Sequence, residues 1–313
     1  MYIVKHRNIF FAMTGGLVVA AVVAVFVFGL HFGTDFTGGT LVQVSYPAER
    51  LPAERIIEAL DEAGFEGYSL REANERDYVL RAENVTDEER RTLLEVLAGG
   101  EYKGEIAQLT EVGPTIGKEL RNKAFIAMAL VLLCILFFIA FAFRKVSKPI
   151  SSWTYGLIAL VTLLHDVIVP VGAFALFGYL WGAQVDTLFV TALLTILGFS
   201  VHDTIVVFDR VRENLRINQE KNRKEDFESV AGRSLDQTIV RSVSTSVTVA
   251  ISLLALYFLG PASTKDFALT LLIGIIAGAY SSIALATPLL VTIERWRGGQ
   301  KKSAKGGSAS GGK

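Results

Sequence analysis

The sequence is poor in cysteine and in charge. Cys134 is the single cysteine among 313 residues, which excludes a disulfide framework or a cysteine-based metal site within one chain. The phosphate-binding motif GxxxxGK[ST] is absent, so we expect no ATP hydrolysis, and no cofactor is expected either. Charged residues make up only 20% of the chain, a share low enough to leave room for long apolar segments.

Hydrophobic residues fill much of the remainder, at 51% of the chain, and the mean hydropathy is +0.42. The acidic and basic residues number 31 each, but they are unevenly placed. Residues 32–122 hold 19 acidic and 10 basic side chains, whereas the rest of the chain holds 12 acidic and 21 basic ones. This pattern predicts an acidic soluble domain inserted into a membrane protein.

Long apolar runs predict six membrane-spanning helices. They cover residues 9–30, 124–143, 150–177, 187–208, 243–259 and 267–293. The first run has 22 residues, enough to cross about 30 Å of hydrocarbon. Because it is long and no Ala-x-Ala-like site follows it, we expect an uncleaved helix rather than a signal peptide.

Between the first two spans the hydrophobic period changes. The spacing predicts strands at residues 40–46, 67–71, 78–82 and 105–112, and helices at 52–63 and 86–97. A capping box of Thr86 and Glu89 opens the second helix. The order β-α-β-β-α-β predicts a ferredoxin-like α+β domain.

The expected organisation follows from these runs. It comprises an N-terminus with the first span (1–31), a ferredoxin-like domain (32–122), five further spans (123–297) that include a cytoplasmic loop (210–240), and a disordered tail (298–313). Basic residues near the span ends number 18 on one side, against Lys265 alone in the short loops opposite. The bias places both termini in the cytoplasm and residues 32–122 outside.

Two carboxylates stand inside the predicted spans. Asp203 follows His202 in the fourth span, and Asp166 follows His165 in the third. A charged side chain near the middle of a bilayer costs roughly 2.5–3.5 kcal/mol on insertion scales, so a sequence that keeps one is generally using it. We therefore predict a functional role for Asp203, whereas Asp166 fits a functional or a structural role equally.

A polar stripe enters the fifth span at helical spacing. It consists of Ser234, Gln237, Arg241, Thr245, Thr248 and Ser252. Such a stripe forms helix–helix contacts more often than a proton path. Arg241 is either a partner of the membrane carboxylate or a side chain that extends to the cytoplasmic interface.

Five motifs in this order resemble the SecF branch of the SecD/SecF protein-export family, within the RND superfamily. They are DFTGG at 35–39, VGP at 112–114, GFSVHDTIVVFDR at 198–210, LDQTIVRS at 235–242 and YSS at 280–282. In the first, Asp35, Gly38 and Gly39 are the motif residues, and the paired glycines indicate a sharp turn into a strand. The resemblance covers the chain to residue 297.

The resemblance implies a six-helix, RND-type half that works with SecD. Asp203 then matches the membrane carboxylate implicated in proton conduction, and Arg241 its basic partner on the next span. His202 stands where the family often has Asn, which offers a second titratable group, and Ser242 stands where it often has Thr. Asp166, His202 and Thr245 are accessory polar candidates.

The same resemblance implies a place and a set of partners. The place is the bacterial inner (plasma) membrane. The partners are SecD, the SecYEG translocon, translocating preproteins, protons and membrane lipids, with no nucleic acid. The implied activity is use of the proton-motive force to promote polypeptide translocation, without enzymatic turnover.

Three alternatives remain at this point. The chain could be an autonomous RND-type exporter of small molecules or lipids, although such exporters usually have twelve spans and two outer domains. It could be an intramembrane metallohydrolase that uses His165-Asp166 and His202-Asp203, although no His-Glu-x-x-His spacing is present. A purely structural subunit would leave the charges in the spans without a purpose.

Overall fold

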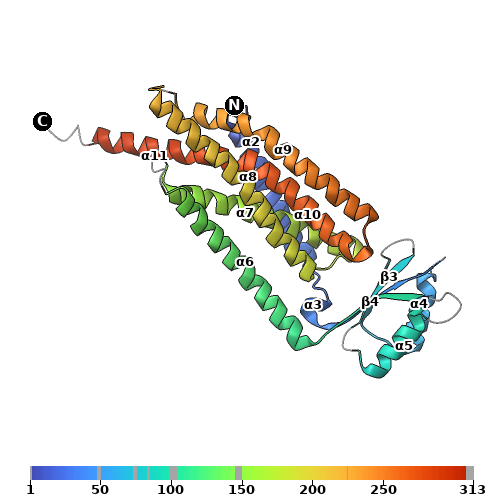
Figure 1. Ribbon diagram of the computed structural model, residues 1–313. Helices are drawn as coiled ribbons and strands as arrows, with labels where there is room; N and C mark the ends of the chain where they lie inside the picture. The colour runs from blue at the N-terminus through green and yellow to red at the C-terminus, as the bar shows by residue number, and fades with distance from the viewer. Residues whose placement is uncertain are drawn as a thin grey trace.

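The computed structural model describes residues 2–47, 51–72, 76–82, 85–98, 104–144, 150–223 and 225–307. Six of its helical segments are long and apolar enough to cross a membrane, which confirms the predicted number of spans. These segments form a bundle, and a small α/β domain projects from one end of it (Figure 1).

The bundle contains most of the helical residues. A one-turn helix α1 (Tyr2–Lys5) precedes the spans α2 (Arg7–Phe28), α6 (Pro114–Ala142), α7 (Ser152–Trp181), α8 (Thr187–Glu220) and α9 (Phe227–Leu259). The last span joins α10 (Ala262–Ser281), a π-helical segment η1 (Ser282–Ala286) and α11 (Thr287–Gly307). The start of α2 and helix α11 lie at the end of the bundle away from the α/β domain (Figure 1).

Helix α8 continues well beyond its apolar part. Its charged extension carries ion pairs at i,i+3 and i,i+4 spacing, such as Arg212 with Asp209 at 2.9 Å and Arg216 with Glu220 at 2.8 Å, which support a helix there. The connection to α9 therefore covers only residues 221–226, within the segment 210–240 predicted as a loop. The predicted disorder of the tail from 298 stays a prediction: α11 is helical to Gly307, and residues 308–313 lie outside the described part.

Helices α7 and α10 occupy the centre of the bundle. Helix α7 packs against α2, α6 and α10, and α10 packs against α7, α8 and α9. Small residues permit this: a Cβ added to Gly274 would collide with Ile196, and one on Gly278 would lie 3.0 Å from the Cβ of Ser200. Helix α6, by contrast, leaves most of its apolar surface uncovered within this chain.

The α/β domain is inserted between α2 and α6. It contains β1 (Gly39–Ser45), α4 (Ala53–Glu62), β2 (Tyr68–Glu72), β3 (Asp77–Ala82), α5 (Asp87–Ala98) and β4 (Glu105–Val112). This is the predicted order of elements. The four strands form one antiparallel sheet in the order β2-β3-β1-β4. The ferredoxin-like assignment itself stays a prediction.

The two faces of the sheet differ. On one face, Val42, Val44 and Leu80 are fully buried and pack in a core with Leu60 of α4 and Leu93 of α5. Those helices lie on the side of the sheet away from the bundle (Figure 1). The capping box predicted for α5 is confirmed, since Thr86 N donates to Glu89 Oε2 at 2.7 Å and Glu89 N donates to Thr86 Oγ1 at 3.3 Å. The other face turns toward the bundle.

Candidate functional site

Asp203 lies on α8 in the interior of the bundle, with 4% of its surface exposed. Its Oδ2 has no hydrogen-bond partner among the described residues, and neither has Oγ1 of the adjacent Thr204. Most buried polar atoms in proteins are hydrogen-bonded, so an unpaired buried carboxylate oxygen is uncommon and requires an explanation. The structure thus shows Asp203 to be buried with one unpaired oxygen, and its predicted role in proton conduction stays a prediction.

Helix α9 supplies the neighbours of this carboxylate. Arg241 and Ser242 both interact with Asp203, as does the exposed His202 of α8. Arg241 is itself exposed, and among the described residues it forms no ion pair with Asp203. Ser242 is buried, but its Oγ forms no hydrogen bond of regular geometry. The predicted pairing of Arg241 with Asp203 therefore stays a prediction, although the two residues lie within electrostatic reach.

The polar stripe on α9 divides into two parts. Near the 221–226 connection, Asn214 of α8 donates to Ser234 Oγ at 2.8 Å and to Gln237 Oε1 at 3.0 Å, so this part joins two helices. Farther along, Thr245 Oγ1 donates to the carbonyl of Arg241 at 2.5 Å, and Thr248 makes the equivalent bond to its own helix. Hydroxyls bonded in this way are occupied by the backbone, and Thr245 shows no bond to Asp203.

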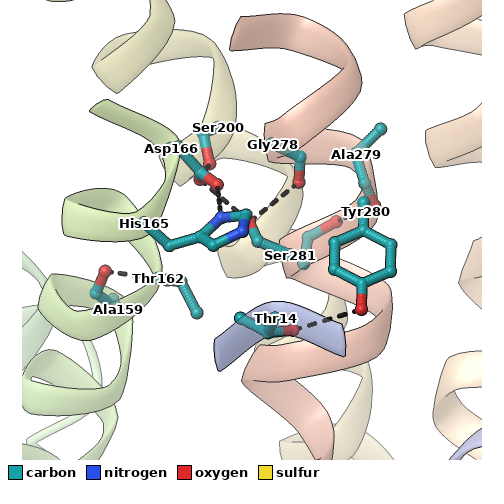
Figure 2. Close-up of polar contacts among 11 residues, drawn as sticks. Thr14, Ala159, Thr162, His165, Asp166, Ser200, Gly278, Ala279, Tyr280 and Ser281 are labelled. Atoms are coloured by element: carbon teal, nitrogen blue, oxygen red, sulfur yellow. Dashed lines mark hydrogen bonds and ion pairs between the residues drawn. The ribbon is translucent and has the colours of Figure 1, made fainter. Parts of the chain in front are cut away.

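Asp166 forms a second polar centre, built from three helices (Figure 2). It is fully buried on α7 and accepts at Oδ1 from Nδ1 of His165 at 2.8 Å. Its Oδ2 accepts from Ser200 Oγ of α8 and from Ser281 Oγ of α10, the latter at 2.9 Å. Tyr280, beside Ser281, shares a hydrogen bond of 3.1 Å with Thr14 of α2, which extends the cluster to a fourth helix.

Asp166 was predicted from the sequence as a candidate, but the two serines that bond it were not. Ser200 and Ser281 lie inside the motifs GFSVHDTIVVFDR and YSS, which was the available signal. They stand 34 and 115 residues from Asp166, however, and nothing in a single sequence pairs them with it.

The DFTGG motif forms the junction between bundle and domain. Asp35 Oδ2 accepts from the backbone N–H of Thr187 at 2.9 Å, at the N-terminus of α8 where a negative charge is stabilised. Gly38 has φ +87° and Gly39 φ +126°, in agreement with the predicted turn. A Cβ on Gly38 would lie 2.8 Å from Cα of Pro114, so the motifs DFTGG and VGP touch each other.

A charged interface joins the face of the sheet that turns toward the bundle to the nearby ends of the spans. The guanidinium of Arg71 on β2 donates to both carboxylate oxygens of Asp266 on α10, at 3.0 and 3.3 Å. Beside this pair is a cavity of about 340 Å³ lined by Arg81, Asp186 and other residues. This interface was not predicted from the sequence, because Arg71 and Asp266 are 195 residues apart.

Asp186 is the most perturbed carboxyl group at this interface. Its Oδ1 accepts from the N–H of Phe189 at 2.8 Å and so caps α8. Burial raises its pKa from 3.8 to about 6; the like charge of Asp35 adds to this, while the Phe189 N–H and the cation of Arg81 oppose it. Asp186 therefore exchanges its proton close to neutral pH.

The metallohydrolase alternative gains no support from the geometry. Within the described ranges no three or more His, Cys, Asp or Glu side chains gather as a metal site. His165 and Asp166 bond each other and two serines instead, as described above.

Comparisons with known proteins give consistent matches. The family described as "Protein export membrane protein SecD/SecF, C-terminal" matches residues 94–296, and the "SecD/SecF GG Motif" matches residues 23–46. The chain is 42% identical to "Protein translocase subunit SecF" of Thermobaculum terrenum over 305 residues, which cover 93% of each protein.

A longer protein also matches. The chain is 35% identical to "Protein translocase subunit SecDF" of Thermus thermophilus over 296 residues, covering 92% of this chain and 38% of that one. The crystal structure of a SecDF from Thermus, described as a translocon-associated membrane protein, superposes with a TM-score of 0.80 at 32% identity, over 94% of this chain and 39% of that one.

Proposed function

Because the chain belongs to the SecD/SecF family of protein-export membrane proteins, as a SecF member, we propose that it uses the proton-motive force to promote polypeptide translocation. It is an accessory subunit of Sec protein export. The observation that carries the proton-driven part is the buried Asp203 carboxylate, whose Oδ2 is unpaired, one helix away from the cation of Arg241.

The physical cycle has two states of this site. Protonated, Asp203 is neutral and has little attraction for Arg241; ionised, it attracts the guanidinium and favours a closer packing of α8 on α9. An elementary charge that crosses the full membrane potential gains about 2.3 kcal/mol per 100 mV. That energy is sufficient to bias a rearrangement between two states of similar stability.

The proposed partner is SecD. The SecDF of Thermus thermophilus contains the matching region within a chain of which this protein covers only 38%. A separate SecD subunit would then supply the remainder. The exposed guanidinium of Arg241, on a helix long and apolar enough to span the membrane, is consistent with a neighbouring subunit, because an isolated cation facing lipid is costly. SecYEG and translocating preproteins are the further proposed partners.

The proposed location is the bacterial plasma membrane, with the α/β domain outside. The predicted charge bias supports this orientation. The position of the domain at the end of the bundle opposite the start of α2 is consistent with it (Figure 1). In this arrangement the domain is the part that would reach an emerging polypeptide.

The test compares two carboxylates of the same helix. Asp203→Asn retains the shape of the side chain and removes its titration, and we expect it to abolish proton-dependent export at normal abundance. Asp209→Asn is the matched control, because Asp209 is exposed and pairs with Arg212. Export by the Asp203 variant at the wild-type level, with the same dependence on the proton gradient, would refute the proposal.

The partner is tested separately by native electrophoresis and mass spectrometry of purified membranes. We expect the chain to migrate with SecD. A stable homo-oligomer without SecD would favour the autonomous exporter instead.

A further inference from the structure

The cluster around Asp166 contains a titratable group that the proposed cycle does not use. Both oxygens of Asp166 have partners, since one imidazole and two hydroxyls bond them. His165 differs in this respect. The residue is 3% exposed, and its Nε2 is buried without any hydrogen-bond partner among the described residues. Figure 2 shows the imidazole ring next to Asp166 and on the same side of the cluster as Tyr280.

The bond to Asp166 fixes the state of the imidazole. We assign the hydrogen of the 2.8 Å contact to Nδ1 of His165, because the two serine hydroxyls already donate to the other oxygen of Asp166 and the carboxylate then accepts from all three partners. Nε2 is then the free position, where a proton can be added. The product would be an imidazolium held directly against an anion, which is how a buried histidine is made stable when charged.

Both neighbouring helices depart from regular geometry at this point. Pro170 lies in α7 four residues after Asp166 and has no N–H, so the carbonyl of Asp166 loses its helical partner. In the last span, the π-helical segment Ser282–Ala286 begins directly after Ser281. Single π-helical turns occur frequently at functional sites, because they are places where a helix can change its register. The cluster thus lies beside two places where the regular α-helical hydrogen-bond pattern is interrupted.

Ser200 connects this cluster to Asp203. It donates to Asp166 Oδ2, and it precedes Asp203 by three residues on α8, so the two side chains lie on neighbouring positions of one helix face. The groups that face His165 are Asp166 on its own helix, Tyr280 and Ser281 on α10 and Ser200 on α8, with Thr14 of α2 behind Tyr280. Asp166 is the ionisable carboxylate among them.

We propose that His165 is a second proton-binding group of the bundle, with Asp166 as its permanent counter-charge and Ser200 as its link to Asp203. When the Asp203 carboxyl releases its proton, its new negative charge acts on the cluster through the hydroxyl of Ser200 and favours the uptake of a proton at Nε2 of His165, while Nδ1 keeps the hydrogen that it donates to Asp166. Asp166 remains ionised throughout. The imidazolium then loses the same proton, and the neutral ring is restored. This proposal rests on the proton-driven function proposed above and extends it, since it adds a second proton-binding group to the cycle.

The first experiment observes the histidine itself and does not depend on export. The full chain, with all histidines labelled with ¹⁵N, is placed in lipid nanodiscs, together with SecD if the two co-purify, and its ring nitrogen shifts are recorded from pH 5 to pH 8. His165→Asn identifies the His165 signals. We expect a doubly protonated His165 at the acidic end of this range, which disappears in Asp166→Asn and persists in the control Asp209→Asn. A single neutral tautomer across this range, or an imidazolium signal unchanged in Asp166→Asn, overturns the proposal.

The second experiment tests whether Ser200 couples His165 to Asp203 or is only a structural contact of Asp166. Ser200→Ala and Ser281→Ala each remove one hydroxyl from Asp166 Oδ2, but only Ser200 lies beside Asp203. We expect the ring shifts of His165 to respond to Asp203→Asn in the wild-type and Ser281→Ala backgrounds, and not in Ser200→Ala. Equal responses in both serine backgrounds overturn the link through Ser200. If His165 binds a proton while Asp203→Asn leaves export intact, the proton site stands and the proposed driving role of Asp203 falls.

Discussion

Replacement of Asp186 by asparagine should stabilise the protein at neutral pH and lose that advantage as the pH is lowered. The pKa of Asp186 is raised by burial from 3.8 to about 6, so the ionised form is disfavoured in the folded chain. A difference of about two units corresponds to about 3 kcal/mol when the group is fully ionised. Asparagine keeps the cap on Phe189, because its side-chain oxygen accepts the same bond.

The sign of the pH dependence follows from the raised pKa. Above pH 6 wild-type Asp186 is ionised and its burial costs the full amount; below pH 6 it takes up a proton, and the penalty declines toward zero near pH 4. The pKa of Asp186 is 3.8 for the ordinary group and about 6 in the folded chain. Linkage between these two values makes the penalty about 1 kcal/mol smaller at pH 5 than at pH 7. The stability gap between Asp186→Asn and wild type should therefore shrink by about that amount.

The assay is thermal unfolding of the full chain in nanodiscs at pH 5, 6 and 7, for wild type and Asp186→Asn. Glu66→Gln, at an exposed position of the α/β domain, serves as the control and should show no pH-dependent gap. A gap that is equal at pH 5 and pH 7, or an asparagine variant that is less stable at pH 7, would show that burial does not control this carboxyl group.

Three further predictions concern the junction and the membrane site. Arg71→Ala and Asp266→Asn should each weaken the docking of the α/β domain by about 1 kcal/mol, the scale of a partly exposed ion pair, and the double variant should be no worse than either single one in hydrogen exchange of the sheet. Gly39→Ala should destabilise the chain by about 1–3 kcal/mol in thermal unfolding, because φ is +126° and the new Cβ would lie 2.6 Å from the carbonyl of Ala82. Arg241→Met combined with Asp203→Asn should be little worse for export than either alone if the two act as one unit.

Each of these three predictions would be contradicted by a specific result. Additive losses at Arg71 and Asp266 would mean that the two side chains do not depend on each other. A silent Gly39→Ala would mean that the turn tolerates a side chain. Multiplying defects at Arg241 and Asp203 would give Arg241 a separate role, such as anchoring α9.

The local features of the fold were predictable, because each depends on neighbours in the sequence. The spans follow from apolar runs, and the helix α5 follows from its capping box at Thr86. The glycine pair was predictable for the same reason: a positive φ at Gly38 and Gly39 is a property of the turn itself. The predicted domain elements agree with the observed ones to within one residue at most ends.

The candidate site was only half predictable. A lone carboxylate in a span is conspicuous in any sequence, so Asp203 and Asp166 could be selected. What surrounds them depends on how helices far apart in the chain pack together. The serines that bond Asp166 come from α8 and α10. Because serine is common in membrane helices, the sequence does not show which serines are buried or which of them bond Asp166. The interface of Arg71 with Asp266 was hidden for the same reason.

The register of the sheet determines how a pull on the α/β domain is transmitted. Gly39 of β1 is paired with Val112 of β4, and these adjacent residues are the points where the chain enters the domain from α2 and leaves it toward α6. Tension directed away from the membrane therefore runs along two covalent backbones side by side, and the hydrogen bonds between them bear little of it. A sideways separation of α2 from α6 would instead unzip the ladder one pair at a time from its membrane end.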